Sequence, residues 1–214
     1  MPVTHPFARA PQQARSAETT RRLLAAAAAL LEERSFDDVS VTEVAERAGV
    51  TIGAFYARFG DKDGLLRVLE SQMMEEFSSL ADAQTAPQRW TGRAIEEALH
   101  EHHLSLIRAY RTHRGIARAL VLRSHSDPQL RKRIEKLNQR NLPRVAGAIA
   151  KHCRISNPSA QRALEFSLLT VRSVCRETIL FKEGWPGGKQ LSDAALAREL
   201  TRMIVGYLGV ESGG

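Results

Sequence analysis

The sequence predicts an all-α protein of about nine helices, with an N-terminal three-helix domain followed by a larger C-terminal helical domain. Leu, Ala and Arg dominate the 214 residues, and aromatic side chains make up only 6% of them. No run of alternating Val, Ile and Thr indicates a β-sheet, whereas apolar residues recur at helical spacing along most of the chain. This length allows one large core or two small ones.

Composition also restricts where the protein acts. No stretch of 18 apolar residues predicts a membrane-spanning helix, and the proline-containing N-terminus lacks the apolar segment of a signal peptide. Two cysteines, Cys153 and Cys175, do not make a disulfide framework. We therefore expect a reduced, cytoplasmic location and no membrane partner.

The positive net charge is unevenly placed. The chain carries a net charge of +7, but residues 1–80 hold nine Lys and Arg against twelve Asp and Glu. The excess of positive charge lies in residues 81–214, which hold 22 basic and 12 acidic side chains. Overall basicity is therefore weak support for nucleic-acid binding, and the argument depends on individual residues.

The most informative segment is residues 36–66. It predicts two short helices joined by a tight glycine turn, and then a third helix that begins at a charged cap. Ser40 and Glu43 form a capping-box pattern for a helix that ends at Gly49. Before it, residues 16–34 carry leucines and alanines at helical spacing, and residues 1–15 predict a disordered arm. This order is typical of a helix-turn-helix unit over residues 16–61.

The helix predicted over residues 51–59 has the pattern of one that lies in a DNA major groove. We expect its apolar side, Ile52, Phe55 and Phe59, to pack on the two preceding helices. Small and hydroxyl-bearing residues face outward, where the backbone can approach the bases. These outward residues are Thr51, Gly53, Ala54 and Tyr56.

Residues 16–70 resemble the TetR family of bacterial transcriptional repressors. The matching positions are Gly49-Val50-Thr51, Gly53-Ala54-Phe55-Tyr56, Phe59, Lys62-Asp63 and Leu65, and Arg58 stands where His is frequent. The resemblance implies phosphate contacts from Thr42, Thr51, Tyr56 and Lys62. It also implies that Ile52, Gly53, Ala54 and Arg58 lie near the base edges, and that Arg22 on the first helix reaches the DNA backbone or minor groove.

The rest of the chain, residues 62–214, predicts further helices. Proline, glycine and capping signals place them near residues 92–113, 115–124, 128–153, 159–182 and 192–208, after a fourth helix that begins at Asp61. Pro143 predicts a kink or break. The resemblance implies that this domain binds a small-molecule effector and forms a homodimer.

We expect the dimer contact to be formed by the helices predicted over residues 159–182 and 192–208, because both are apolar over much of their surface. The residues concerned are Leu164, Leu168, Val171, Cys175, Leu196, Leu200, Met203 and Tyr207. The alternative is that they form a thick core within one chain. A two-fold dimer would place two recognition helices on a palindromic operator.

The effector pocket is less well marked. We expect it to be lined by Trp90, His102, His103, Leu106, Tyr110, Phe166 and Arg172, since such pockets are apolar with few polar groups. The arginine-rich residues 108–133 either form a solvated face or attract an anion. The effector is unidentified and is either anionic or apolar.

Two other functions compete with a ligand-released repressor. Glu97, His100 and His103 share helical spacing and would suit a metal-dependent enzyme. However, no second Glu-x-x-His copy completes a di-iron set, so we expect no metal or cofactor. The other alternative is a protein that organises DNA without sequence specificity.

Overall fold

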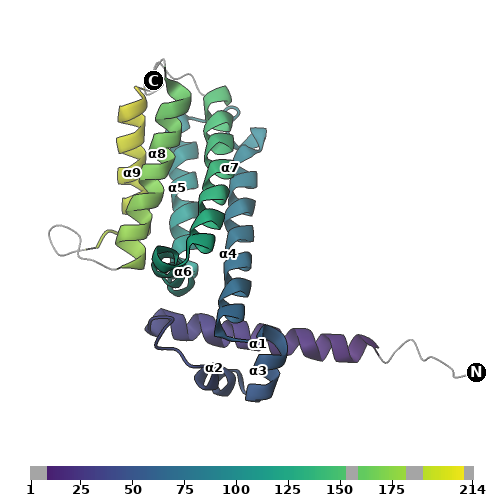
Figure 1. Cartoon of the computed structure of the whole chain (residues 1–214). Helices are drawn as coiled ribbons and strands as arrows, with labels where there is room; N and C mark the ends of the chain where they lie inside the picture. Colours follow the sequence, from purple (N-terminus) through teal and green to yellow (C-terminus); the bar gives the residue numbers. More distant parts are fainter. Residues whose placement is uncertain (1–8, 153–158, 182–189, 210–214) are drawn as a thin grey trace, which may run out of the picture. The chain divides into compact units, whose positions relative to one another are not determined.

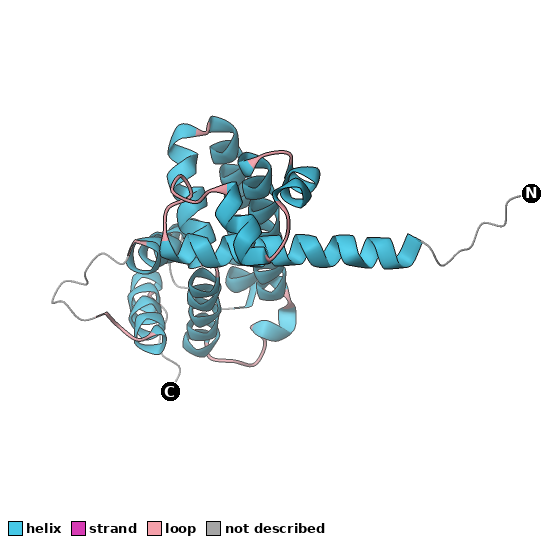
Figure 2. Cartoon of the chain, turned by 90° about the horizontal axis from the view of Figure 1, so that it is seen from below, coloured by secondary structure: helices cyan, strands magenta, loops and turns pink. Residues whose placement is uncertain are grey.

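The computed structural model describes residues 9–152, 159–181 and 190–209. Every regular element in these ranges is helical, which confirms the predicted all-α class (Figure 2). None of the described helices is both long and apolar enough to cross a membrane. The chain divides into two compact units, residues 1–72 and 73–214.

Nine α-helices span the described residues (Figure 1). They are α1 (Arg9–Glu33), α2 (Val41–Ala48), α3 (Ile52–Phe59), α4 (Lys62–Thr85), α5 (Ile95–Thr112), α6 (Arg114–Ser126), α7 (Pro128–His152), α8 (Ala160–Cys175) and α9 (Asp193–Leu208). A short 3-10 turn, η1 (Pro87–Arg89), precedes α5, and a π-helical segment, η2 (Arg176–Leu180), extends α8.

One expectation about helix boundaries was wrong. Helix α1 begins at Arg9 and not near Ser16, so the expected arm of residues 1–15 is helical from residue 9 onward. Pro11 is compatible with this start, because an amide in the first helical turn has no partner one turn earlier. Residues 1–8 lie outside the described part of the chain.

Helix α7 runs through Pro143 as one element, so the proline does not break it. Val145, Ala146 and Ile149, which follow the proline, are buried, and α7 packs along α8. The side chain of Gln161 on α8 donates to the Pro143 carbonyl at 3.3 Å. Tertiary packing thus holds a helix that a proline disfavours by about 3 kcal/mol.

The first unit has the core that the apolar spacing predicts. Leu23, Leu30 and Leu31 of α1 are buried together with Val44 of α2, and Phe55 of α3 is fully buried. Phe55 also contacts Phe59, with ring centroids 5.2 Å apart. Burial of the back of α3 orients its opposite face toward solvent.

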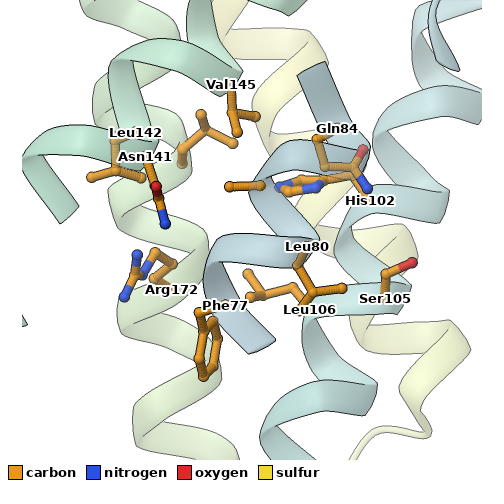
Figure 3. A pocket seen from close by; sticks show the side chains of 12 residues that line it. Phe77, Leu80, Gln84, His102, Ser105, Leu106, Asn141, Leu142, Val145 and Arg172 are labelled. Atoms are coloured by element: carbon orange, nitrogen blue, oxygen red, sulfur yellow. The ribbon is translucent and has the colours of Figure 1, made fainter. Parts of the chain in front are cut away.

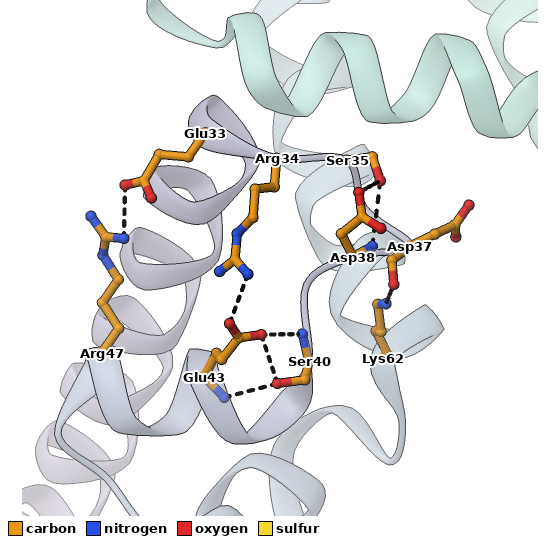
Figure 4. A network of polar contacts seen from close by, with 9 residues as sticks. All are labelled: Glu33, Arg34, Ser35, Asp37, Asp38, Ser40, Glu43, Arg47 and Lys62. Atoms are coloured by element: carbon orange, nitrogen blue, oxygen red, sulfur yellow. Dashed lines mark hydrogen bonds and ion pairs between the residues drawn. The ribbon is translucent and has the colours of Figure 1, made fainter.

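Polar contacts fix α2 against α1 (Figure 4). Ser40 and Glu43 form the predicted capping box, with the Ser40 amide donating to the Glu43 carboxylate at 2.9 Å. Arg34 donates to the same carboxylate at 2.8 Å, and Arg47 pairs with Glu33 at 2.9 Å. The hydrogen bonds from Ser40, followed by Arg34, lower the pKa of Glu43 to about 2.

A tight corner joins α3 to α4. Gly60 ends α3 in a positive-φ conformation, φ 75°, that glycine adopts without strain. The Asp61 carboxylate then accepts from the Gly64 amide at 2.5 Å and caps α4. A Cβ atom added at Gly64 would lie 1.9 Å from the Phe59 carbonyl oxygen, so only glycine fits here.

We predict that Gly64→Ala destabilises the first unit, because the new methyl group meets backbone that cannot move away without opening the corner. Overpacking of this kind costs roughly 1 to 3 kcal/mol. Thermal unfolding followed by circular dichroism checks this. Gly53→Ala is the control, since a Cβ there has its nearest neighbour at 3.9 Å. Equal melting temperatures for the two variants would contradict the prediction.

Candidate DNA-binding surface and effector cavity

The outward face of α3 carries the residues expected to meet DNA. Thr51, Gly53 and Tyr56 are exposed, and the Tyr56 side chain is 51% exposed. Ile52 is 44% exposed, so the expectation that it packs in the core was wrong. It is the first residue of the helix, and burial begins one turn later at Phe55. Its exposure is compatible with the second role that the family resemblance implies, near the base edges.

Two hydroxyl groups lie at helix N-termini in this unit. Thr51 is the N-cap of α3, and its Oγ1 accepts from the Ala54 amide at 3.2 Å. Thr42 is exposed in the first turn of α2. Amides without helical partners and the positive end of the helix dipole favour an anion at both places.

The three predicted basic contacts are held by backbone carbonyls. Arg22 of α1 donates to the Gly49 carbonyl at 3.1 Å, and Lys62 of α4 donates to the Asp37 carbonyl at 3.1 Å (Figure 4). Arg58 donates to the Ala54 and Ser16 carbonyls at 3.2 and 3.4 Å. Each cation retains further N–H groups, so it is oriented by the fold while keeping donors for a phosphate.

The apolar stripe predicted for dimerisation lies mostly inside the chain. Its members Leu164, Leu168, Val171, Cys175, Leu196 and Leu200 are buried in the core of the second unit, so they are not available to a partner. Helix α8 packs on α5, α7 and α9, and its most apolar side is buried, which spacing alone does not reveal. Met203 and Tyr207 are exposed as expected, at 46% and 53%.

The exposed apolar side chains of α8 are different ones. Phe166 is 58% exposed and Leu169 is 47% exposed. The Phe166 ring lies 6.0 Å from the Tyr207 ring of α9. Phe166, Leu169, Met203 and Tyr207 are hereafter called the α8–α9 face.

A cavity of about 50 Å³ lies within the second unit, between α4, α5, α7 and α8 (Figure 3). Three of the residues predicted for the effector pocket line it: His102, Leu106 and Arg172. The remaining lining residues are Phe77, Leu80, Ala81, Gln84, Ser105, Asn141, Leu142, Val145 and Leu168. The α4 residues recur at helical spacing, which is the sequence signal that could have identified them.

Four predicted pocket residues lie elsewhere. Trp90 is buried, with its indole N–H donating to the Gln84 carbonyl at 2.6 Å. Tyr110 is buried against Phe77, with ring centroids 5.1 Å apart, and His103 is buried beside α9. Phe166 is on the α8–α9 face. Trp90 and Tyr110 thus contact the lining residues Gln84 and Phe77 without lining the cavity themselves.

Arg172 is the only charged side chain among the twelve described lining residues, none of which is Asp or Glu. Its guanidinium lies 5.8 Å from the centre of the Phe77 ring. Burial, with the positive charges of Arg89 and Arg172, lowers the pKa of His102 to about 4. The cavity therefore contains one cation and a neutral imidazole at physiological pH.

His103 is also neutral, and its hydrogen bonds define its tautomer. The Thr201 hydroxyl donates its proton to the Ala197 carbonyl at 2.8 Å, so it accepts from His103 Nδ1–H at 2.9 Å. Burial lowers the pKa of His103 to about 3. Its Nε2 atom is left without a hydrogen-bond partner in the described structure.

The residues of the metal-enzyme alternative do not form a ligand set. Glu97 pairs with Arg93 at 2.8 Å, and His103 is bonded to Thr201. Within the described ranges, no group of three or more His, Cys, Asp and Glu side chains is placed to hold a metal ion. Glu97 and His100 instead border an open hollow of about 410 Å³ between α5 and α9.

Parts of the chain are similar in sequence to known bacterial regulators. Residues 23–69 match the family described as bacterial regulatory proteins, tetR family. The HTH-type transcriptional repressor BdcR of Escherichia coli (strain K12) is 37% identical over 125 residues, which span 57% of this chain and 56% of that repressor. Residues 23–69 are therefore similar to TetR-family regulators, and the chain spans about half the length of the curated repressor that it matches.

Solved structures of TetR-family proteins share the fold. A TetR-family transcriptional regulator from Mesorhizobium loti MAFF303099 superposes with a TM-score of 0.67 at 20% identity, covering 91% of this chain and 97% of that one. Salmonella enterica GusR gives a TM-score of 0.64 at 18% identity, covering 89% and 95%. The likeness in fold therefore extends over most of the chain, whereas the family model matches residues 23–69.

We predict that the free energy of unfolding falls as the pH is lowered from about 6.5 to about 4.5. His102 and His103 have folded pKa values below 6.5, so the unfolded chain binds more protons than the folded chain in this window. The stabilisation is complete above the unfolded pKa and is lost as the pH falls. Urea denaturation at several pH values measures it.

The variant His102→Gln should reduce this pH dependence, whereas His125→Gln, at an exposed position on α6, should leave it intact. A free energy of unfolding that stays flat through this pH window in the unsubstituted chain would refute the prediction.

Proposed function

We propose that this chain is a dimeric transcriptional repressor that binds a palindromic operator and is released by a small-molecule effector. The observation that carries the proposal is the exposed face of α3, backed by a fully buried Phe55 and joined to TetR-family sequence on both sides. The relative BdcR is a transcriptional repressor, which supports the direction of regulation. As a bacterial DNA-binding regulator, the protein would act in the cytoplasm.

In this proposal, residues 16–61 contact DNA. The backbone at exposed Gly53 approaches the base edges, because no side chain stands in the way. Ile52, Ala54 and Arg58 lie beside it on α3. Thr42, Thr51, Tyr56, Lys62 and Arg22 hold phosphates around this reader, and such contacts fix its position on the duplex without reading sequence.

Residues 62–214 bind the effector and dimerise. A second copy covers the α8–α9 face, where four large apolar side chains are exposed on two neighbouring helices. Such a contact is isologous, since the same face is used by both copies. The two-fold axis then presents two α3 helices to the two halves of a palindrome.

Release by the effector requires that the ligand prefer one conformation of the protein over another. Helix α4 supports such coupling, because it starts at Lys62 immediately after α3 and contributes Phe77, Leu80, Ala81 and Gln84 to the cavity wall. A ligand that displaces this wall acts on the same helix that begins beside the DNA reader. DNA affinity then falls by the difference in ligand affinity between the two conformations.

We predict that Tyr56→Phe lowers operator affinity by about tenfold, because a hydroxyl hydrogen bond to a charged phosphate contributes about 1.5 kcal/mol. Electrophoretic mobility shifts with the DNA upstream of the protein's own gene measure the change. Ser79→Ala, which removes an exposed hydroxyl of the second unit away from the α8–α9 face, is the control and should bind normally. Equal affinity for operator and scrambled DNA, with a steep salt dependence, would instead indicate a non-specific DNA organiser.

We predict that Leu169→Glu converts the dimer to monomer, because it places a charge in the centre of an apolar interface. Leu122→Glu is the matched control, since Leu122 on α6 is 48% exposed but lies off the α8–α9 face. Sedimentation velocity distinguishes the two states. The dimer assignment to this face fails if both variants sediment as the unsubstituted chain does.

A further inference from the structure

We propose that the effector cavity binds a short-chain monocarboxylate, with the carboxylate held by Arg172 and Asn141 and the alkyl chain held by the leucine and valine wall. This inference rests on the proposed function as a ligand-released regulator and adds the chemical class of the ligand.

The first observation is an uncompensated positive charge. Arg172 is half-buried in the cavity wall, and it forms no ion pair with an acidic side chain in the described ranges. Two of its neighbours, Tyr110 and Cys175, are neutral at physiological pH, because burial raises the pKa of Tyr110 and raises that of Cys175 to about 12. Arg172 forms a side-chain hydrogen bond with Tyr110, which does not neutralise the positive charge. A charge withdrawn from water needs a counter-ion, and the cavity supplies none.

The second observation concerns the two buried amides of the cavity. Gln84 and Asn141 are 3% and 5% exposed. The Gln84 side-chain oxygen accepts from Arg89 at 3.2 Å, and the Asn141 side-chain oxygen accepts from Arg140 at 3.2 Å. Both oxygens are thus engaged, while neither NH₂ group has a hydrogen bond within the part of the chain that the structure describes.

The Asn141 amide adds a donor beside the Arg172 guanidinium, whereas Gln84 lies across the cavity beside His102 (Figure 3). Figure 3 shows the Asn141 side chain from α7 and the Arg172 side chain from α8 on the same side of the cavity. The Ser105 hydroxyl is already donated to the Glu101 carbonyl at 2.8 Å. The polar groups left for a ligand are therefore the guanidinium, two NH₂ groups and the neutral His102, which favours an anion that accepts several hydrogen bonds.

The third observation is the volume and lining of the cavity, which indicate the size and the charge of the ligand. A volume of about 50 Å³ corresponds to on the order of four water-sized units, which is the size of a short acyl chain. Leu80, Leu106, Val145 and Leu168 supply an apolar wall that inorganic phosphate cannot use. One guanidinium balances one negative charge, so a monocarboxylate fits better than a dianion.

Isothermal titration calorimetry of the full-length protein with butanoate tests the proposal. Butanamide and 1-butanol have similar shapes without the charge, and inorganic phosphate has charge without the alkyl chain. We expect measurable binding of butanoate, and binding at least about tenfold weaker for the other three. Equal binding of butanamide, tighter binding of phosphate, or no binding of butanoate would overturn the proposal.

Variants locate the binding site. Arg172→Met should weaken butanoate binding by about tenfold or more, and Arg172→Lys should weaken it less because the charge is kept. Asn141→Asp preserves shape and the acceptor for Arg140 but repels a carboxylate, so it should also weaken binding. Arg202→Met, at an exposed arginine of α9, is the control. Unchanged affinity in folded Arg172→Met and Asn141→Asp would refute the site.

Operator binding by the same preparations, measured without any ligand, separates this inference from the proposed function. A protein that shifts operator DNA but binds no carboxylate contradicts only the ligand class. A protein that shifts no DNA yet binds butanoate through Arg172 contradicts the regulator function and leaves the ligand site standing.

Discussion

The close approach of Gly64 to the Phe59 carbonyl is the constraint on which the first unit depends. The oxygen occupies the place of a side chain, so α3 and α4 meet at a corner that no other residue permits. Asp61 caps α4 at the same point, and Phe55 holds α3 on its other side. Because α4 continues to Gln84, the geometry fixed at this corner belongs to the helix that also forms a wall of the cavity.

Much of the first unit could be predicted because its signals are local. The capping box of Ser40 and Glu43, and the left-handed Gly49, each involve residues within one helical turn. The carbonyl partners of Arg22, Arg58 and Lys62 could not be predicted in this way. Ser16, for example, lies 42 residues from Arg58, and only the folded arrangement brings them together. Ile52 has the spacing of a buried residue but is exposed. Spacing shows which side of a helix is apolar, but it does not show whether the first residue of that side still contacts the neighbouring helices.

The second unit was less predictable, because α8 has apolar residues on more than one side. Spacing identified the Leu164 to Cys175 stripe but could not tell that this stripe packs internally, while Phe166 and Leu169 remain exposed. The residues that line the cavity were hard to predict for the same reason. The sequence predicted Arg172 as a lining residue, but it did not predict the lining residues of α4 and α7. A cavity depends on which helix faces meet, and that information is distributed over segments far apart in sequence.

Pro143 has a consequence for how this wall can change. Because proline has no amide hydrogen, the carbonyl one turn before it lacks its usual helical partner. Asn141, Leu142 and Val145, which line the cavity, lie on both sides of this gap. A helix bends most readily where its ladder of hydrogen bonds is interrupted. The α7 wall can therefore bend at this point, and a change in its curvature would alter the space between α7 and the helices that face it across the cavity.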